Sequence, residues 1–311
     1  MHLVLGADSA FGLATVRALL AAGQRVRGVV AGEAALPEGV EVVRGDAQEL
    51  APLVEAAKGC ESIVHALEVP FHRWDTDYLR ATDHVAEAAG LTGAAVVFPG
   101  RLWSLKPVYE VPLPPDGPAL DVNDRPSLKG RLLAGLEDQL RQNTEMRNVR
   151  TLIVRSPEMF GPGVDDPVVA PMLRAALAGR PVPWLGRADV PRAYAFTEDV
   201  AAVAVALLLR KDRPAFEVAG VAGHVLPHAR AWAEAFAKAA GTAPAGVRAR
   251  PGWQLRLAGL VDRATRHLAE LAPHWEGPLY VDDTDTNKAL PDWKPVRLDD
   301  ALHRTMQALR G

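Results

Sequence analysis

The 311-residue sequence has only one cysteine, Cys60, and no cluster of His and Cys residues at zinc-ligand spacing. One cysteine excludes an internal disulfide, so we expect Cys60 to be a small buried residue and the site to hold no metal. The longest apolar run, residues 200–209, is about half of the roughly 20 residues that cross a bilayer, so it predicts a buried helix. The first residues lack the pattern of a signal peptide. These features predict a cytoplasmic protein.

Neither sign of charge dominates, because the formal net charge is −3. Without a basic field, the chain is not expected to bind nucleic acid or a membrane surface. Hydrophobic residues make up 49% of the sequence, enough to bury a substantial core. We therefore expect a globular protein whose partner is a small-molecule substrate or ligand.

Short β-rich runs alternate with segments of helical periodicity through the first half of the chain, which is typical of βαβ units. Strands are predicted at residues 3–5, 26–30, 40–43, 62–66, 94–98 and 150–154, helices at 10–22, 49–58, 74–89 and 127–143, and helix C-caps at Gly23, Gly59 and Gly90. The pattern predicts an α/β fold: a Rossmann-like doubly wound parallel sheet with a smaller C-terminal lobe. Residues 1–160 are expected to form mainly the Rossmann domain, and residues 161–311 the last Rossmann elements and the lobe.

Proline and glycine interrupt the regular pattern after residue 154, and such loops at the carboxyl ends of strands often shape a binding cleft. Before them, leucines recur every four residues in the helix predicted at 127–143. This stripe either packs on the sheet or forms part of a homodimer seam. The segment 298–309 is amphipathic and predicts a terminal helix.

Residues 3–12 read LVLGADSAFG, an apolar strand followed by a glycine turn and a helix. In the three-glycine form of this turn, the middle glycine lets the backbone approach a pyrophosphate, and the outer two serve the bend and the helix packing. Gly6 and Gly12 hold the outer places and Ser9 the middle one. Ser9 adds a Cβ where the ligand comes close, although its hydroxyl is a potential phosphate donor, so we expect altered dinucleotide binding.

The end of the second predicted strand usually selects between NAD and NADP through an acid or an arginine. Ala31 and its neighbours are uncharged there, and Glu33 is the first acid, either a ribose ligand or a solvated loop residue. Asp46, after the third strand, is either a partner of the adenine amino group or a helix-initiating aspartate. The sequence therefore does not choose between the two cofactors.

Together, the stretches LVLGADSAFG, VVRGDA, IVHALE, LIVRSPEMFGPG, AYAFTEDVAAVAVAL and DDTDTNKALPDW resemble an extended short-chain dehydrogenase/reductase of the NAD-dependent epimerase/dehydratase family. The resemblance implies a Rossmann domain that binds NAD or NADP, a substrate lobe and often a homodimer. It implies that the cofactor is held by Gly6, Asp8, Ser9, Ala10, Phe11, Gly12, Ala31, Asp46, Ala47, Ala66, Leu67 and Pro157.

The catalytic residues usual in this family are absent from the sequence. Members use a Tyr-x-x-x-Lys pair, in which the lysine lowers the tyrosine pKa, and a Ser or Thr after the fifth strand. None of the four tyrosines has a lysine four residues later, and Pro99 stands at the serine position. The chain therefore resembles an atypical member.

The helix that should carry the pair aligns in two registers. With Lys129 as the lysine, Arg125 takes the tyrosine place; with Glu137 as the acid that often follows the pair, Lys129 takes the tyrosine place and Leu133 the lysine place. Either way a cation replaces a phenol. Lys129 is our candidate catalytic acid, and the alternative is a solvated lysine at a helix start.

Other residues have weaker patterns. His65 lies within an apolar strand and is expected to be a hydrogen-bonded core residue, whereas His72 and Asp75 are expected near the nicotinamide end of the cleft. An aromatic set either walls a pocket or packs the lobe: Trp103, Tyr109, Phe160 and Trp184. Arg155 is expected to position the substrate loop.

Two functions remain open from the sequence. The first is an atypical NAD(P)-dependent epimerase, dehydratase or reductase acting on a small molecule through Lys129, water or the substrate itself. The second is a non-catalytic dinucleotide-binding or sensor protein. The fold pattern supports the first and the three missing catalytic identities support the second, since fold alone does not decide function.

Overall fold

The computed structural model describes residues 1–108, 110–121, 123–124 and 127–310. Its centre is a seven-stranded parallel sheet with the order β10-β6-β5-β4-β1-β2-β3. The strands are β1 His2–Leu5, β2 Val26–Val30, β3 Val40–Arg44, β4 Ser62–His65, β5 Ala95–Arg101, β6 Thr151–Ser156 and β10 Phe216–Gly220. The strand order reverses between β1 and β4, and this switch point is where open α/β sheets bind ligands.

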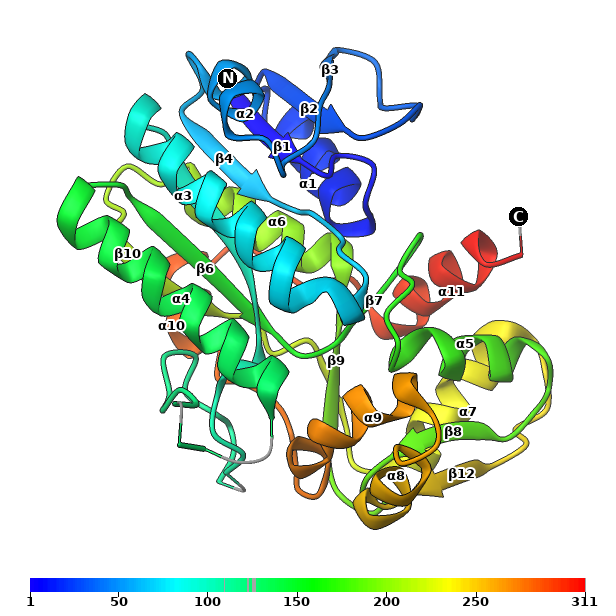
Figure 1. The fold of residues 1–311 in the computed structure, drawn as a ribbon. Helices are drawn as coiled ribbons and strands as arrows, with labels where there is room; N and C mark the ends of the chain where they lie inside the picture. The colour runs from blue at the N-terminus through cyan, green and yellow to red at the C-terminus, as the bar shows by residue number, and fades with distance from the viewer. Residues whose placement is uncertain (109, 122, 125–126, 311) are drawn as a thin grey trace.

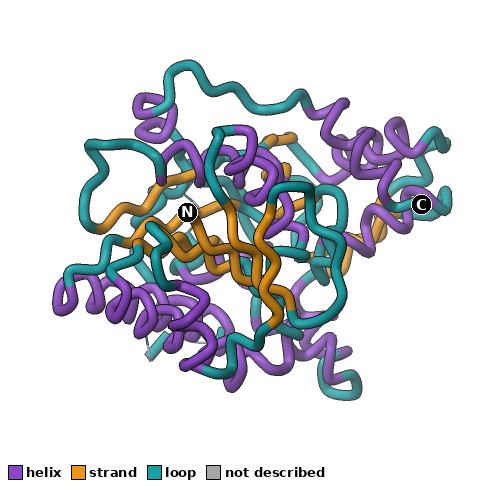
Figure 2. The backbone as a smooth tube through the Cα atoms, turned by 90° about the horizontal axis from the view of Figure 1, so that it is seen from above, coloured by secondary structure: helices purple, strands orange, loops and turns teal. Residues whose placement is uncertain are grey.

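Helices cover both faces of this sheet, because its buried strands present apolar side chains alternately to each side. Val4 packs into the core under α1 (Ala10–Ala21) and α6 (Thr197–Leu208). Leu3 and Leu5 face α2 (Leu50–Ala57), α3 (Leu79–Thr92) and α4 (Leu128–Arg147). Figure 1 shows α3 and α4 in front of the strands and α6 behind, and Figure 2 shows the strands between helical layers.

Most of the remaining elements lie beyond the carboxyl ends of the strands, toward the lower right of Figure 1, whereas α10 (Thr284–Ala289) lies beside β10 at the left. Two small sheets lie there, one of β7 (Met159–Phe160), β9 (Arg192–Phe196) and β11 (His224–Leu226), the other of β8 (Val182–Leu185) and β12 (Val247–Arg250). The helices are α5 Val169–Leu177, α7 Ala229–Ala240, α8 Gly252–Ala258, α9 Arg263–Glu270, α10 Thr284–Ala289 and α11 Leu298–Ala308. Short turns complete the chain: η1 Phe71–Arg73, the π-helical η2 Trp74–Tyr78, η3 Leu102–Ser104 and η4 Ala272–Trp275.

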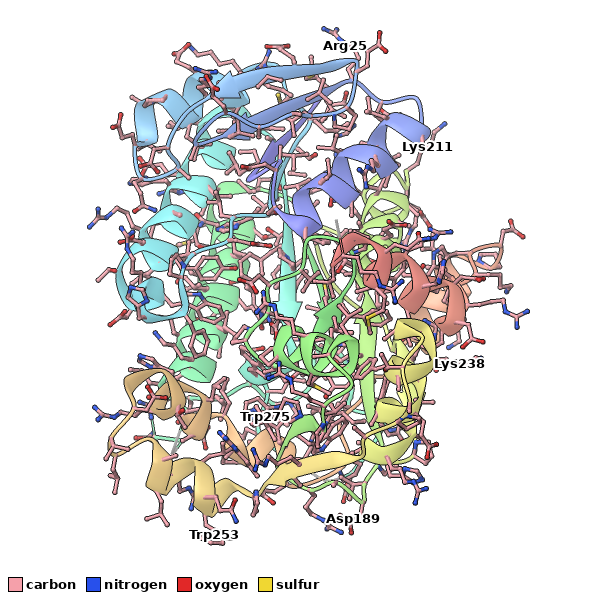
Figure 3. All side chains as sticks on the ribbon, turned by 90° about the vertical axis from the view of Figure 1, so that its right-hand side faces the viewer. Arg25, Asp189, Lys211, Lys238, Trp253 and Trp275 are labelled. Atoms are coloured by element: carbon pink, nitrogen blue, oxygen red, sulfur yellow. The ribbon has the colours of Figure 1, made fainter. Side chains whose placement is uncertain are left out.

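The Glu158 carboxylate links the region of the central sheet to the C-terminal elements. Glu158 Oε1 accepts hydrogen bonds of 3.0 Å from the indoles of Trp103 on η3 and Trp275 on η4. Figure 3 shows Trp275 inside this part of the molecule and Trp253 directed outward. The two indoles share one buried acceptor, which couples the C-terminal elements to the end of β5.

The doubly wound sheet and its predicted strands are confirmed, with small shifts at their ends. Residues 200–209 fall almost wholly in α6, which is buried, and no described helix is long and apolar enough to span a membrane. The C-cap expected at Gly90 is wrong. Helix α3 continues to Thr92, and Gly93 ends it with a φ of +76°, while Gly90 packs against the side chain of Arg147.

The leucine stripe of α4 faces mainly inward. Leu133, Leu136 and Leu140 are buried against the sheet, whereas Leu128 is 48% exposed. Packing therefore accounts for most of the stripe. A role of its outer residues in a homodimer stays a prediction.

Candidate functional site

The glycine turn after β1 is built by close backbone contacts. Gly6 has a φ of +69°, and a Cβ on it would lie 2.6 Å from the carbonyl oxygen of Ala66. A Cβ on Gly12 would lie 2.0 Å from the carbonyl oxygen of Gly6. Both contacts are too short for any side chain, so each position requires glycine. The turn therefore brings the first residues of α1 close to the ends of β1 and β4.

The Ser9 side chain is engaged within the turn, and the altered dinucleotide binding expected from it stays a prediction. Its hydroxyl donates to the Ala66 carbonyl at 2.7 Å and accepts from the Gly12 N–H at 3.0 Å, which makes Ser9 the N-cap of α1. Its side chain is thus occupied within the protein and is not among the residues lining the cleft. The serine serves the helix start and links it to the loop after β4.

A cleft of about 510 Å³ opens at the switch point between β1 and β4. Its walls come from the start of α1, the loop after β4, the end of β5 and the segment after β7. Of the predicted cofactor residues, Ala10, Phe11, Ala66 and Leu67 line it. Gly6 and Gly12 support it from behind, Asp8 is exposed, and Pro157 is buried two residues before the lining residue Met159.

The predicted ribose end lies outside this cleft. Ala31 is exposed just after β2, and Glu33 forms a 3.3 Å ion pair with Arg44 at the end of β3. Asp46 is exposed and accepts from the Gln48 N–H at 2.9 Å, while the N-cap position of α2 is Glu49. Ala47 is buried. Asp46 therefore forms a local turn and does not start the helix itself.

Lys129 lies at the start of α4, with a residue exposure of 1%. Its Nζ is 3.9 Å from Asp75 and 5.5 Å from the ring centre of Phe71. Burial lowers the Lys129 pKa, and the charges of Asp75 and Glu270 oppose that shift. The solvated alternative is wrong. Lys129 is nevertheless not among the residues that line the cleft, whereas Phe71 is.

The structure describes all the residues of one α4 register but not all those of the other. Arg125 lies outside the described residues. In the other register, Leu133 takes the lysine place and is buried, and Glu137 is buried beside β6. Pro99 lies within β5 and lines the cleft at the predicted serine position.

The sequence predicts that Arg155 positions the substrate loop; in the structure, its side chain forms a buried network. Its guanidinium pairs with Glu137 at 2.7 Å, donates to the Arg101 carbonyl at 3.0 Å and also contacts the Ser104 hydroxyl. Ser104 donates to Glu137 at 3.1 Å. Burial raises the Glu137 pKa, and Arg155 counters this shift. The network joins α4, β5 and β6 behind the cleft.

A different aromatic set walls the cleft from the one expected. Phe71, Trp74 and Tyr78 line it, and the Trp74 and Tyr78 rings stack with centroids 5.3 Å apart. Trp103, Phe160 and Trp184 are instead buried core residues, and Tyr109 lies outside the described residues. The sequence signal was the FHRWDTDY segment after β4, whose helical spacing indicates packing but not which ring faces a ligand.

Neighbouring residues of that segment have separate roles. His72 is exposed and absent from the cleft lining, while Asp75 lies beside Lys129. His65 is a core residue, as predicted: it is fully buried and hydrogen-bonded to Thr82 Oγ1 at 3.0 Å, and burial lowers its pKa to about 4. Cys60 is also buried, as expected.

The charge of the cleft is mainly negative. Among the residues that the structure describes, its lining includes Glu68, Asp165 and Asp166 but only one cation, Arg101. Arg101 pairs with Asp166 at 3.0 Å, and its guanidinium lies 5.0 Å from the Trp103 ring centre. Among the described residues, no group of three or more His, Cys, Asp or Glu side chains is arranged to hold a metal ion.

Sequence comparison matches residues 135–220 to the NAD dependent epimerase/dehydratase family. This confirms the resemblance, over a segment that begins after Lys129 and does not include the glycine turn. A search of curated protein sequences found no match.

Solved structures with the same fold cover almost the whole chain. One, gox2253, has a TM-score of 0.80 and 19% identity, over 100% of this chain and 98% of that one. The epimerase Mth375 from Methanothermobacter thermautotrophicus has a TM-score of 0.78 and 18% identity, over 99% and 91%. The UDP-glucuronic acid 4-epimerase from Bacillus cereus, in complex with NAD, has a TM-score of 0.76 and 16% identity, over 99% and 98%. At these identities the likeness shows the fold.

Proposed function

From its resemblance to the NAD-dependent epimerase/dehydratase family, we propose that this protein binds a nicotinamide dinucleotide and acts on a small molecule as an atypical epimerase, dehydratase or reductase. The observation that carries the proposal is the cleft at the β1–β4 switch point, with the start of α1 in its wall. A helix N-terminus there favours the negative charge of a pyrophosphate.

The backbone of this chain fits such a ligand. A side chain on Gly6 or Gly12 would collide with backbone atoms. The turn therefore requires glycine at both positions, and it leaves the start of α1 open to the cleft. Ala10 and Phe11 would face the pyrophosphate, and Ala66 and Leu67 the nicotinamide half. The dinucleotide, when bound, supplies a hydride acceptor or donor.

The cofactor is NAD or NADP, and the structure of the B. cereus epimerase with NAD supports the first. Replacing Ala31 with arginine tests whether the adenosine ribose of the cofactor lies at the end of β2. A guanidinium there can pair with the 2′-phosphate of NADP. We expect A31R to shift the NADP/NAD affinity ratio about tenfold toward NADP, measured by calorimetry. An unchanged ratio would place the ribose elsewhere.

Lys129 remains the proposed acid. Burial lowers its pKa, and its Nζ lies 5.5 Å from the ring centre of Phe71, which borders the cleft. A lysine of lowered pKa can donate a proton or hold an anionic substrate, provided that it reaches the cleft. The part of the chain from about residue 161 onward, apart from its Rossmann elements, is proposed to supply the substrate lobe.

A second candidate function is non-catalytic dinucleotide binding or sensing. Two observations favour it: Lys129 is not among the residues that line the cleft, and in one register Leu133 fills the lysine place of the family pair. In that case the cleft binds ligand, and no proton donor of suitable pKa reaches it through α4.

One series of measurements separates these functions. The melting temperature should rise with NAD, NADP and their reduced forms. A ligand at a concentration of 100 Kd raises the free energy of unfolding by about 2.7 kcal/mol. Turnover of secondary alcohols, ketones and nucleotide sugars should be slow in the wild type. K129M should abolish turnover and leave dinucleotide affinity within about twofold, whereas the exposed control K288M should change neither.

Each outcome has a consequence. Absence of stabilisation by every dinucleotide would overturn the proposed function. Binding without any turnover would favour the sensor. Turnover that survives K129M would remove Lys129 from the mechanism and leave the enzyme function intact.

A further inference from the structure

Large apolar side chains are exposed on α8 and on the turn that follows it. Trp253 and Leu257 on α8 are 60% and 58% exposed, and Leu260 and Val261 in the turn are 73% and 90% exposed. Figure 3 shows Trp253 directed outward at one end of the molecule. The spacing i, i+4, i+7 and i+8 is typical of one helical face. We call these four residues the apolar tip.

Contacts within the protein fix the position of the apolar tip. Leu255, also on α8, is 1% exposed, and the Gly252 N–H at the helix start donates to Glu276 Oε1 at 2.7 Å. The turn is held by Arg266, whose Nε donates to the Gly259 carbonyl at 2.9 Å. An anchored helix and turn therefore present the four apolar side chains to solvent, so their exposure is a feature of the fold.

Arginines accompany the apolar tip. The sequence of residues 247–267 contains five arginines and one acidic residue, Asp262. Arg248 and Arg250 on β12 and Arg256 on α8 are exposed. Figure 1 shows that β12 leads directly into α8, so these arginines flank the tip.

Acidic residues at this end are already engaged. Asp262 is the N-cap of α9 and accepts from the Thr265 N–H at 2.8 Å. Asp189, labelled at the same end in Figure 3, pairs with Arg187 at 2.7 Å. The net charge of −3 is an average over the whole chain, and the end that carries the apolar tip is basic.

We propose that this end of the molecule docks on the surface of an anionic lipid bilayer. The apolar tip enters the headgroup region, and Arg248, Arg250 and Arg256 lie against the anionic headgroups. Tryptophan favours the boundary between headgroups and acyl chains, and an apolar face flanked by arginines is typical of segments that lie in this interface. The proposal is independent of the proposed dinucleotide function, and it departs from the expectation drawn from net charge alone.

A second copy of this chain fits the tip less well. A twofold contact places the same patch on both partners, so arginines would face arginines and repel. Stable dimers also use about 20–30 residues on each side, far more than the four of the tip. A bilayer requires no matching groove, and its negative surface attracts the arginines.

The test is flotation of the full-length protein with vesicles of phosphatidylcholine, with and without about 30% phosphatidylserine. We expect the wild type to bind the anionic vesicles at least about tenfold more strongly than the neutral ones. Binding should weaken in about 0.5 M salt, because salt screens the attraction between the arginines and the lipid surface.

Two double variants separate the apolar and the charged contributions. L260S/V261S should lose at least about tenfold in binding to anionic vesicles, because two apolar side chains no longer enter the lipid. R248Q/R250Q should lose about fivefold for each arginine on anionic vesicles and keep its weak binding to neutral ones. All four positions are exposed, so we expect the melting temperatures to stay close to that of the wild type.

Matched controls lie on other elements. Met146 on α4 is 73% exposed, and Lys288 on α10 is also exposed. M146S removes a comparable exposed apolar side chain, and K288Q removes a comparable exposed charge. Each should change vesicle binding by less than about twofold.

Several results would overturn the proposal. They are a wild type that does not float with anionic vesicles, L260S/V261S binding that equals the wild type, or an equal loss in M146S and K288Q. Sedimentation equilibrium covers the remaining occupant: a wild-type dimer that dissociates in L260S/V261S would assign the tip to a second copy and reject the bilayer. None of these results bears on dinucleotide binding, which is measured separately.

Discussion

The two ends of the cleft are built differently. At the proposed phosphate end, backbone groups make the site: Gly6 and Gly12 approach other backbone atoms within distances that no side chain allows. At the proposed catalytic end, side chains make it, and Lys129, Leu133 and Pro99 stand where the resemblance implies a different set. Phe71, from the segment after β4, lines the cleft and lies 5.5 Å from Lys129 Nζ.

The difference shows what each kind of site requires. A backbone-built turn depends only on small residues at a few close contacts, so the Ser9 replacement is absorbed as a helix cap. A side-chain-built centre depends on particular chemical groups, and replacing them changes what it can do. The same fold can therefore retain its ligand cleft and carry altered or absent catalysis.

The largest expected effect comes from adding one methyl group to the phosphate turn. G12A places a Cβ against the Gly6 carbonyl, and we expect more than about 4 kcal/mol of destabilisation in urea unfolding. The control is G135A, on an exposed face of α4 where nothing lies within 4 Å of the new Cβ; it should stabilise by about 0.5–1 kcal/mol. Equal effects of the two would contradict the backbone contact.

The catalytic end should be most sensitive to loss of a buried charge partner. R155M leaves Glu137 buried without its guanidinium, so we expect a loss of about 3 kcal/mol or more. The double variant R155M/E137L should recover much of that loss, because the uncompensated charge is removed as well. If the double variant is as unstable as R155M, packing and not charge explains the effect.

Acid should act on the side-chain-built end through His65. Its pKa of about 4 in the folded protein lies below the ordinary 6.5, so the stabilisation is complete above about pH 6.5 and is lost as the pH falls toward 4. We expect a loss of about 3 kcal/mol, and a shallower acid limb in H65Q. His2, His224 and His274, whose pKa values burial also lowers, remain in both proteins, so the difference isolates His65. Identical acid limbs would refute this account.

The smallest effect probes the serine of the turn. S9A removes the N-cap of α1 and the bond to the Ala66 carbonyl, so we expect a loss of about 1 kcal/mol. S9G should lose less, and neither variant should tighten NAD, because the hydroxyl faces the protein. Tighter NAD binding by S9G would show that Ser9 obstructs the diphosphate after all.

Local patterns in the sequence were enough to predict the doubly wound sheet, the glycine turn and the buried states of His65 and Cys60. The reason is that the alternation of apolar and polar residues, helical periodicity and the positions of glycines are short-range signals of burial and backbone conformation. The absence of a Tyr-x-x-x-Lys pair was equally a property of the sequence alone.

Tertiary structure decided what those residues face. Only the tertiary structure brings Phe71, which lines the cleft, close to Lys129 at the start of α4, and only the approach of β6 to α4 turns Arg155 toward Glu137. Glu68 lines the same cleft as Ala10, from which 58 positions separate it, and no local pattern encodes that neighbourhood. Contacts of this kind depend on how loops from different strands meet, so the chemistry of the cleft follows from the fold as a whole.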